Sequence, residues 1–268
     1  MREEEVDFIL SECNRVVRRQ LSPKDVRAAW AGVRPLVADP NAPLGDTKSL
    51  SREHVVESLP SGLVTIAGGK WTTYRKMAQD AVDMCCSINP ALSHAQPCKT
   101  AGTFELLGSD RLGEVCKSDF DLITSTLREE FELSSDMARH LRYNYGTNSL
   151  QVVQIALDEP HRMLLERLHP SYPLLRAEVV FASRHEFAET AVDVLAHRTR
   201  LSFLNAAAAL ESLPDVLQLM REEKGWGDER VESEREAAVR YLRIGMNPAP
   251  GASLFKKRPD PEMFPVSA

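Results

Sequence analysis

The sequence predicts an α+β protein in two parts, a mixed strand-and-helix part over residues 1–95 and an all-helical part over residues 105–245. Short apolar runs broken by Pro, Gly, Asp and Asn are typical of strands and loops, and they gather in the first part. In the second part apolar residues recur near the 3.6-residue period of an α-helix. The linker is "SINPALSHAQPCKTAG", and a tail over residues 246–268 with five prolines is expected to be flexible.

The first part begins with an amphipathic helix over residues 3–20, because apolar residues from Val6 to Val17 repeat near the helical period. A short helical turn is expected at Ser22-Pro23-Lys24-Asp25. Residues 28–56 indicate a strand near residues 33–36, a long loop and a second strand. A further strand over residues 63–67 ends at Gly68-Gly69, and a helix over about residues 72–86 follows.

The second part is a series of helices. They are expected near residues 120–131, from Ser135, from Ser149, over a longer stretch from Leu174, and over residues 190–209, 214–224 and 229–244. Leu210, Leu213, Leu217 and Met220 should fall on one apolar face of their helix.

Composition excludes several classes of protein. The net charge of −6 and the pI near 5.7 argue against a nucleic-acid partner. No apolar run approaches the roughly 18 to 20 residues that span a membrane. The acidic start MREEEVDFIL has the pattern of neither a signal peptide nor a transit peptide, so no targeting signal is expected in this chain.

Metal and disulfide sites are not expected. The five cysteines are odd in number and contain no C-x-x-C, which is typical of reduced, packing thiols. The seven histidines lack ligand spacing, with no H-E-x-x-H.

The stretch "VTIAGGKWTTYRKMAQDAVD" is the most informative in the chain. The stretch does not match a phosphate-binding P-loop, G-x-x-x-x-G-K-[ST]. The residue five before Gly69 is Val64 where the motif requires glycine, and Trp71 replaces the required Ser/Thr. A dinucleotide fingerprint G-x-G-x-x-G does not occur. The remaining functional interpretation is a strand–Gly-Gly–helix turn that brings backbone, Lys70 and a helix N-terminus to a flat, electron-rich ligand. A plain capped turn with Lys70 in solvent is the structural alternative.

Further segments carry a family resemblance. "GGKWTTYRKMAQDAVD" resembles the flavin-proximal segment of FAD-dependent, quinone-linked mitochondrial glycerol-3-phosphate dehydrogenases. "WAGVRPLVADP" and "LSREHVV" are similar to that family's arginine-bearing segments, and "EVVFASRHEFAETAVDVLAHRTRLSFLNAAAALESLPDVLQLM" is similar to its C-terminal helical domain. The resemblance covers nearly all of residues 1–245 and implies the C-terminal portion of an FAD-dependent oxidoreductase (DAO-like) domain over residues 1–95, followed by an all-α domain.

The resemblance implies oxidation of sn-glycerol 3-phosphate to dihydroxyacetone phosphate by FAD, with electrons passed to ubiquinone. It makes Arg34 and Lys70 the catalytic residues, with Arg34 and Arg52 binding the substrate. Bidentate arginines suit a phosphate dianion, and Lys70 would stabilise developing negative charge. Gly68, Gly69, Lys70, Thr72 and Thr73 would line the FAD, and no metal is implied.

The resemblance also implies that the family's N-terminal half, with its G-x-G-x-x-G, has no counterpart here. We therefore expect an N-terminally truncated chain that is inactive alone and binds FAD weakly or not at all. The family's setting is the mitochondrial inner membrane, where its members associate peripherally. A homodimer is left open.

Two other functions are alternatives for this sequence. One is a non-catalytic helical interaction module left from such an enzyme. The other is a different flavoprotein oxidase of the same broad fold, which the long helical domain argues against. Arg198 and Arg200 in "HRTRLSFLN" are interpreted as structural, because Asp193 precedes His197 by four residues and helical ion pairs are expected there. Trp30, Trp71 and Trp226 are interpreted first as apolar anchors.

Overall fold

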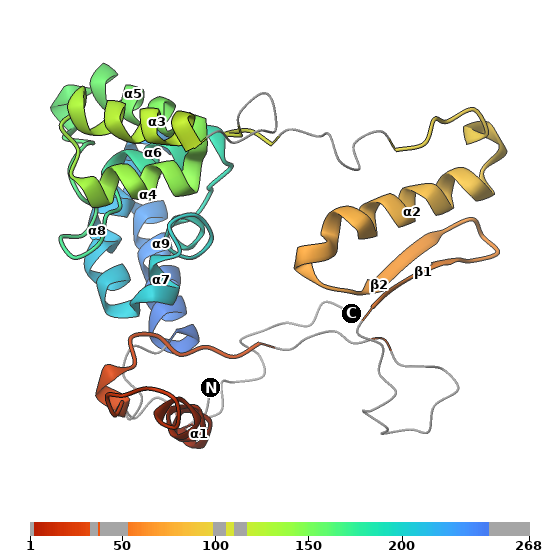
Figure 1. The fold of residues 1–268 in the computed structure, drawn as a ribbon, viewed down its shortest axis with the longest axis horizontal. Helices are drawn as coiled ribbons and strands as arrows, with labels where there is room; N and C mark the ends of the chain where they lie inside the picture. Colours follow the sequence, from red (N-terminus) through yellow and green to blue (C-terminus); the bar gives the residue numbers. More distant parts are fainter. Residues whose placement is uncertain (1–2, 33–36, 38–52, 99–105, 110–116, 247–268) are drawn as a thin grey trace. The chain divides into compact units, whose positions relative to one another are not determined.

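The computed structural model describes residues 3–32, 37, 53–98, 106–109 and 117–246, with only the backbone described for residues 117–120. The chain divides into two compact units (Figure 1). One is Gly32–Glu105, and the other joins Met1–Ala31 to Leu106–Ala268. Residues 1–31 therefore group with the helical unit, whereas the sequence analysis placed them with the strands.

In its described residues, the smaller unit is a β-hairpin covered by an α-helix. Strands β1 (His54–Ser58) and β2 (Val64–Gly68) pair antiparallel, with His54 opposite Gly68. The turn between them needs Gly62, whose φ of 84° lies in the left-handed region that favours glycine. A 3-10 turn, Trp71–Thr73, leads into α2 (Tyr74–Ile88), which packs against both strands. The predicted strand and helix are confirmed here. The strand predicted near residues 33–36 lies outside the described residues.

In the described residues of the larger unit, the named secondary-structure elements are all helical (Figure 1). It contains α1 (Glu3–Asn14), α3 (Lys117–Glu129), α4 (Ser135–Tyr145), α5 (Ser149–Asp158), α6 (Arg176–His185), α7 (Leu201–Leu204), α8 (Ala206–Lys224) and α9 (Asp228–Arg240), with π-helical turns at Asp193–Arg198 and Tyr241–Gly245. A 3-10 turn at Pro23–Asp25 confirms the predicted short helical turn.

The core of this unit lies around α6 and α8. Seven consecutive residues of α6, from Ala177 to Ser183, are buried, as expected for a helix surrounded by others. The predicted apolar face of α8 is confirmed, since Leu213, Leu217 and Met220 are buried and Leu210 packs against the core.

Several predicted helix limits were wrong. Helix α1 ends at Asn14, six residues early, and α6 has only ten residues. The single helix predicted over residues 190–209 is broken at Arg200, whose φ is 57°, and at Asn205. The Asn205 side chain caps α8, which then runs on through Pro214, where a boundary was predicted. Local capping by Asn205 outweighed helical periodicity at the second break.

The segment before Gly32 is tied to the helical unit. The amide of Ala29 donates to the Met246 carbonyl at 3.0 Å, and the amide of Ala206 donates to the Arg27 carbonyl at 3.1 Å. The Trp30 ring meets Phe203 edge-on, with centroids 4.9 Å apart. These contacts explain why residues 1–31 belong to the helical unit.

Candidate functional site

The two glycines at the end of β2 are required by the protein's own packing. Gly68 and Gly69 have φ values of 73° and 80°, which L side chains rarely adopt. A Cβ on Gly68 would lie 2.9 Å from the Glu53 carbonyl oxygen. One on Gly69 would lie 2.7 Å from Sδ of Met77 and 3.0 Å from Cβ of His54. The glycine pair therefore lets the chain turn sharply between the hairpin and α2.

The residues that follow the two glycines form an exposed surface at the start of α2. Lys70 is extended and precedes the 3-10 turn, and Lys70, Thr72 and Thr73 are all exposed. The first N–H groups of a helix have no partner within it and carry its positive dipole end. Beside them Trp71 and Tyr74 stack with centroids 5.9 Å apart. The Lys70 cation, the start of the helix and the Trp71–Tyr74 pair therefore share one surface.

Two side chains shape this surface, and the hydroxyl of one of them, Thr73, was expected from the sequence to lie at or near the helix N-cap. The Thr73 hydroxyl donates to the Lys70 carbonyl at 3.0 Å and makes no capping bond to a helix amide. Trp71 is 88% exposed, so its interpretation as an apolar anchor was wrong. A large exposed ring is instead available to a partner or ligand.

Five of the seven predicted site residues come together in this surface: Gly68, Gly69, Lys70, Thr72 and Thr73. The two predicted substrate arginines, Arg34 and Arg52, lie outside the described residues.

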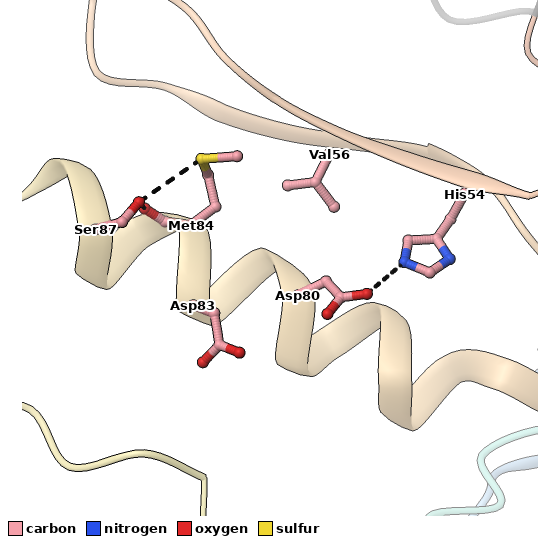
Figure 2. A pocket seen from close by; sticks show the side chains of 6 residues that line it. All are labelled: His54, Val56, Asp80, Asp83, Met84 and Ser87. Carbon is pink, nitrogen blue, oxygen red and sulfur yellow. Dashed lines mark hydrogen bonds and ion pairs between the residues drawn. The ribbon is translucent and has the colours of Figure 1, made fainter.

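A pocket of about 430 Å³ lies between β1 and α2 (Figure 2). His54 and Val56 line it from the strand, and Asp80, Asp83, Met84 and Ser87 line it from the helix. The sequence analysis missed these residues. His54 and Asp80 are 26 positions apart, so only the folded hairpin brings them together.

Two of the residues that line the pocket, His54 and Asp80, form a three-membered polar cluster with Lys76. Nε2 of His54 lies 2.8 Å from Oδ2 of Asp80, and Nζ of Lys76 lies 2.6 Å from Oδ1. Hydrogen bonds from Lys76 and then from His54 lower the pKa of Asp80 below its ordinary value. Asp80 therefore carries its negative charge at neutral pH. Of these two contacts, only the Lys76–Asp80 pair could have been predicted from the sequence, because the two residues are four positions apart on one helix.

A second pocket, of about 660 Å³, lies in the helical unit beside α6 and α8. Arg162 bonds to Glu159 at 2.5 Å and to Glu223 at 2.6 Å, and Arg184 bonds to the same two carboxylates. The cluster ties the segment that follows α5 to α6 and α8. Because both arginines are already paired with carboxylates, the cluster offers no spare cation to an anionic ligand.

The interpretation of the "HRTR" segment as structural agrees with the ion pair between His197 Nδ1 and Asp193 Oδ1, at 3.1 Å. Arg198 donates to the Glu186 carbonyl oxygen. In the part of the chain that is described, no three His, Cys, Asp or Glu side chains gather into a metal site. None of the described helices is long and apolar enough to cross a membrane.

Comparison with known proteins gives one consistent result. Residues 98–231 match the family described as the C-terminal domain of alpha-glycerophosphate oxidase. Over 252 residues the chain is 40% identical to the mitochondrial glycerol-3-phosphate dehydrogenase of Mesocricetus auratus, covering 91% of this chain and 32% of that protein. It is 37% identical over 249 residues to the mitochondrial enzyme of the same name from Arabidopsis thaliana, covering 90% of this chain and 38% of that protein.

A solved structure is also similar. The glycerol-3-phosphate dehydrogenase from Bacillus halodurans, complexed with FAD, matches with a TM-score of 0.70 and 26% identity. The match covers 91% of this chain and 45% of that chain. This chain therefore spans less than half of the solved relative and about a third of the curated relatives, 32% in the Mesocricetus protein.

Proposed function

The chain belongs to the family of the C-terminal domain of alpha-glycerophosphate oxidase, and we propose that it forms the C-terminal part of an FAD-dependent glycerol-3-phosphate dehydrogenase. The family resemblance and the fold class predicted from the sequence are confirmed. The proposed reaction is oxidation of sn-glycerol 3-phosphate to dihydroxyacetone phosphate. It rests on the names of relatives that are longer than this chain.

The observation that carries the proposal is the exposed turn from Gly68 to Thr73. Its donor set fits a flavin, because a lysine and the N–H groups of a helix start face the same solvent-accessible surface. FAD, when bound, supplies the acceptor for the hydride removed from C2 of the substrate. Lys70 would stabilise negative charge that develops at this surface, and the backbone of Gly68 and Gly69 would lie along the cofactor.

The substrate's phosphate needs cations of fixed geometry. We assign Arg34 to bind the substrate close to the reacting carbon and Arg52 to meet the phosphate. A guanidinium presents a planar fork of donors that matches phosphate oxygens two at a time. Lysine would supply the same charge without that geometry, so Arg34→Lys separates charge from shape.

The electron acceptor and the location are part of the same proposal. We place the enzyme at the mitochondrial inner membrane, attached peripherally, with ubiquinone as the acceptor of electrons. Support for the compartment comes from the curated relatives, which are named mitochondrial. Ubiquinone and the membrane rest on the family resemblance alone.

One observation favours the second candidate, a non-catalytic interaction module. The large buried cluster lies within the helical unit, running from Leu127 to Leu242, so this unit has a core of its own. Such a unit needs neither FAD nor substrate to stay folded. The two functions differ in whether the hairpin unit contributes to flavin chemistry.

A chimera separates them. This chain replaces the aligned C-terminal segment of the Mesocricetus enzyme, and FAD content and dye reduction by glycerol 3-phosphate are measured. The proposal predicts bound FAD and substrate-dependent reduction, both weakened by Lys70→Ala. Lys24→Ala, an exposed lysine on the helical unit, is the matched control and should change neither. A folded chimera with FAD but without substrate oxidation would favour the interaction module.

A further inference from the structure

Gly69 is enclosed by two side chains from different elements. His54, at the start of β1, pairs in register with Gly68. Met77, one turn into α2, approaches Gly69 from the helix, since a Cβ there would lie 2.7 Å from the Met77 Sδ. The position of the glycine turn therefore depends on how closely β1 and α2 are held together.

Asp80 joins those two elements. It lies on the helical turn after Met77 and pairs with His54 through an N–O distance of 2.8 Å. The two side chains are 19% and 29% exposed, so this pair is better shielded from water and salt than a surface ion pair. In Figure 2 the Asp80 carboxylate points at the His54 ring across the gap between strand and helix.

The other groups around the pair do not replace it. Lys76 holds the second oxygen of Asp80, but it comes from α2 itself and is 61% exposed. The Asp83 carboxylate points away from His54 in Figure 2. Val56 and Met84, which also line the pocket, offer no charge. Among the residues that line this pocket, His54–Asp80 is the polar link between β1 and α2.

We propose that His54 and Asp80 are positioning residues, which hold the Gly68–Gly69–Lys70 turn and the first turn of α2 in their ligand-binding arrangement. They act through the turn and contact no substrate or cofactor themselves. The ligand role rests on the proposed function, since it takes the turn to be the flavin surface. The mechanical role stands on the contacts of His54, Asp80 and Gly69 alone.

The first test is amide hydrogen exchange on the full chain, resolved by NMR. Asp80→Ala and His54→Ala should each raise exchange at Gly69, Lys70 and Thr73 by about tenfold, as expected for losing a hydrogen bond to a charged group. His54→Gln keeps an N–H donor toward Asp80 and should restore most of the protection. Lys76→Ala, which leaves the strand–helix link intact, is the matched control and should change exchange less than threefold, or about 0.6 kcal/mol at most.

Two exchange results would overturn the proposal. One is unchanged exchange at the turn in both alanine variants. The other is an equal rise at the turn and at the amides of Glu57 and Thr65, which face each other in the middle of the hairpin, because that pattern means loss of the whole unit and not of the turn's position.

The second test measures the ligand role in the chimera, as the dissociation constant for FAD. His54→Ala should weaken FAD binding about tenfold, with His54→Gln close to the parent. Faster exchange with unchanged FAD affinity would overturn the positioning role. If the parent chimera binds no FAD, the proposed function and the ligand role fail together, whereas the exchange data still decide the mechanical role.

Discussion

At the scale of single residues, Glu178 is a buried carboxylate held by three donors. It is 1% exposed, and its carboxylate accepts from the Leu175 amide at 2.7 Å, from Nε2 of His140 at 2.9 Å and from the Tyr145 hydroxyl at 2.8 Å. Burial, and then the Glu178 charge, raise the pKa of Tyr145 well above its ordinary value, so this hydroxyl stays a donor. A buried carboxylate is tolerated because three donors surround it.

We predict that Glu178→Gln destabilises the chain by about 2–4 kcal/mol, because its amide group must face one of three buried donors. Tyr145→Phe removes one donor and should cost less, about 1–2 kcal/mol. Urea unfolding followed by circular dichroism measures both. The control, Glu236→Gln, changes an exposed residue of α9 and should stay within about 0.5 kcal/mol. A Glu178→Gln variant as stable as that control would contradict the account.

Asp136 gives a pH-dependent prediction. Hydrogen bonds from the Ser134 hydroxyl and then from Arg167 lower the pKa of Asp136 from 3.8 to about 2. A carboxyl group with a depressed pKa stabilises the fold above its unfolded value of 3.8, and this stability is lost as the pH falls toward 2. Because the side chain is 55% exposed, solvent screening keeps the effect below about 1 kcal/mol. Asp136→Asn should therefore flatten the fall in unfolding free energy between about pH 4 and 2. An unchanged slope would reject this.

At the scale of elements, periodicity predicted where helices lie better than where they end. The apolar face of α8 was found because Leu213, Leu217 and Met220 follow the helical period. The break before it was missed because it depends on a side chain that bonds to backbone: Asn205 accepts from the amides of Ala207 and Ala208 at 3.1 and 3.2 Å. At Pro214 the error was the reverse, because a helix boundary was predicted there and none exists. Pro214 lies exposed inside α8, and the helix continues through it.

The Asn205 cap can be tested directly. Asn205→Ala should cost about 1 kcal/mol of unfolding free energy, because two amides at the start of α8 lose their acceptor. Asn205→Asp keeps an acceptor oxygen at the same place and should remain within a few tenths of a kcal/mol. Equal stability of the alanine variant and the parent in urea unfolding would show that the cap does not hold the break between α7 and α8.

At the scale of the whole molecule, features that are contiguous in the chain could be predicted from the sequence, and contacts between distant segments could not. The Gly68–Gly69–Lys70 turn was recognisable because glycines, lysine and helix start are contiguous in the chain. The His54–Asp80 pair was not, because it needs the hairpin register and the helix laid across it. The attachment of residues 1–31 to the helical unit likewise depends on contacts such as Trp30 with Phe203, which are 173 positions apart (203 − 30). Local chemistry was therefore predictable, and pairings between distant segments were not.

The central claim is that this chain supplies a cationic site for an anionic substrate beside a flavin surface. Its most direct test is stopped-flow flavin reduction by glycerol 3-phosphate in the Mesocricetus chimera, with FAD content measured in each variant. Arg34→Ala should lower kcat/KM by about 30- to 1,000-fold, the cost of losing a charge-assisted contact to a buried anion, with FAD content unchanged. Arg34→Lys should fall between this variant and the parent, because it keeps the charge and loses the planar fork. If Arg34→Ala retains both its FAD and a near-parental kcat/KM, Arg34 does not bind the substrate and the proposed site is wrong.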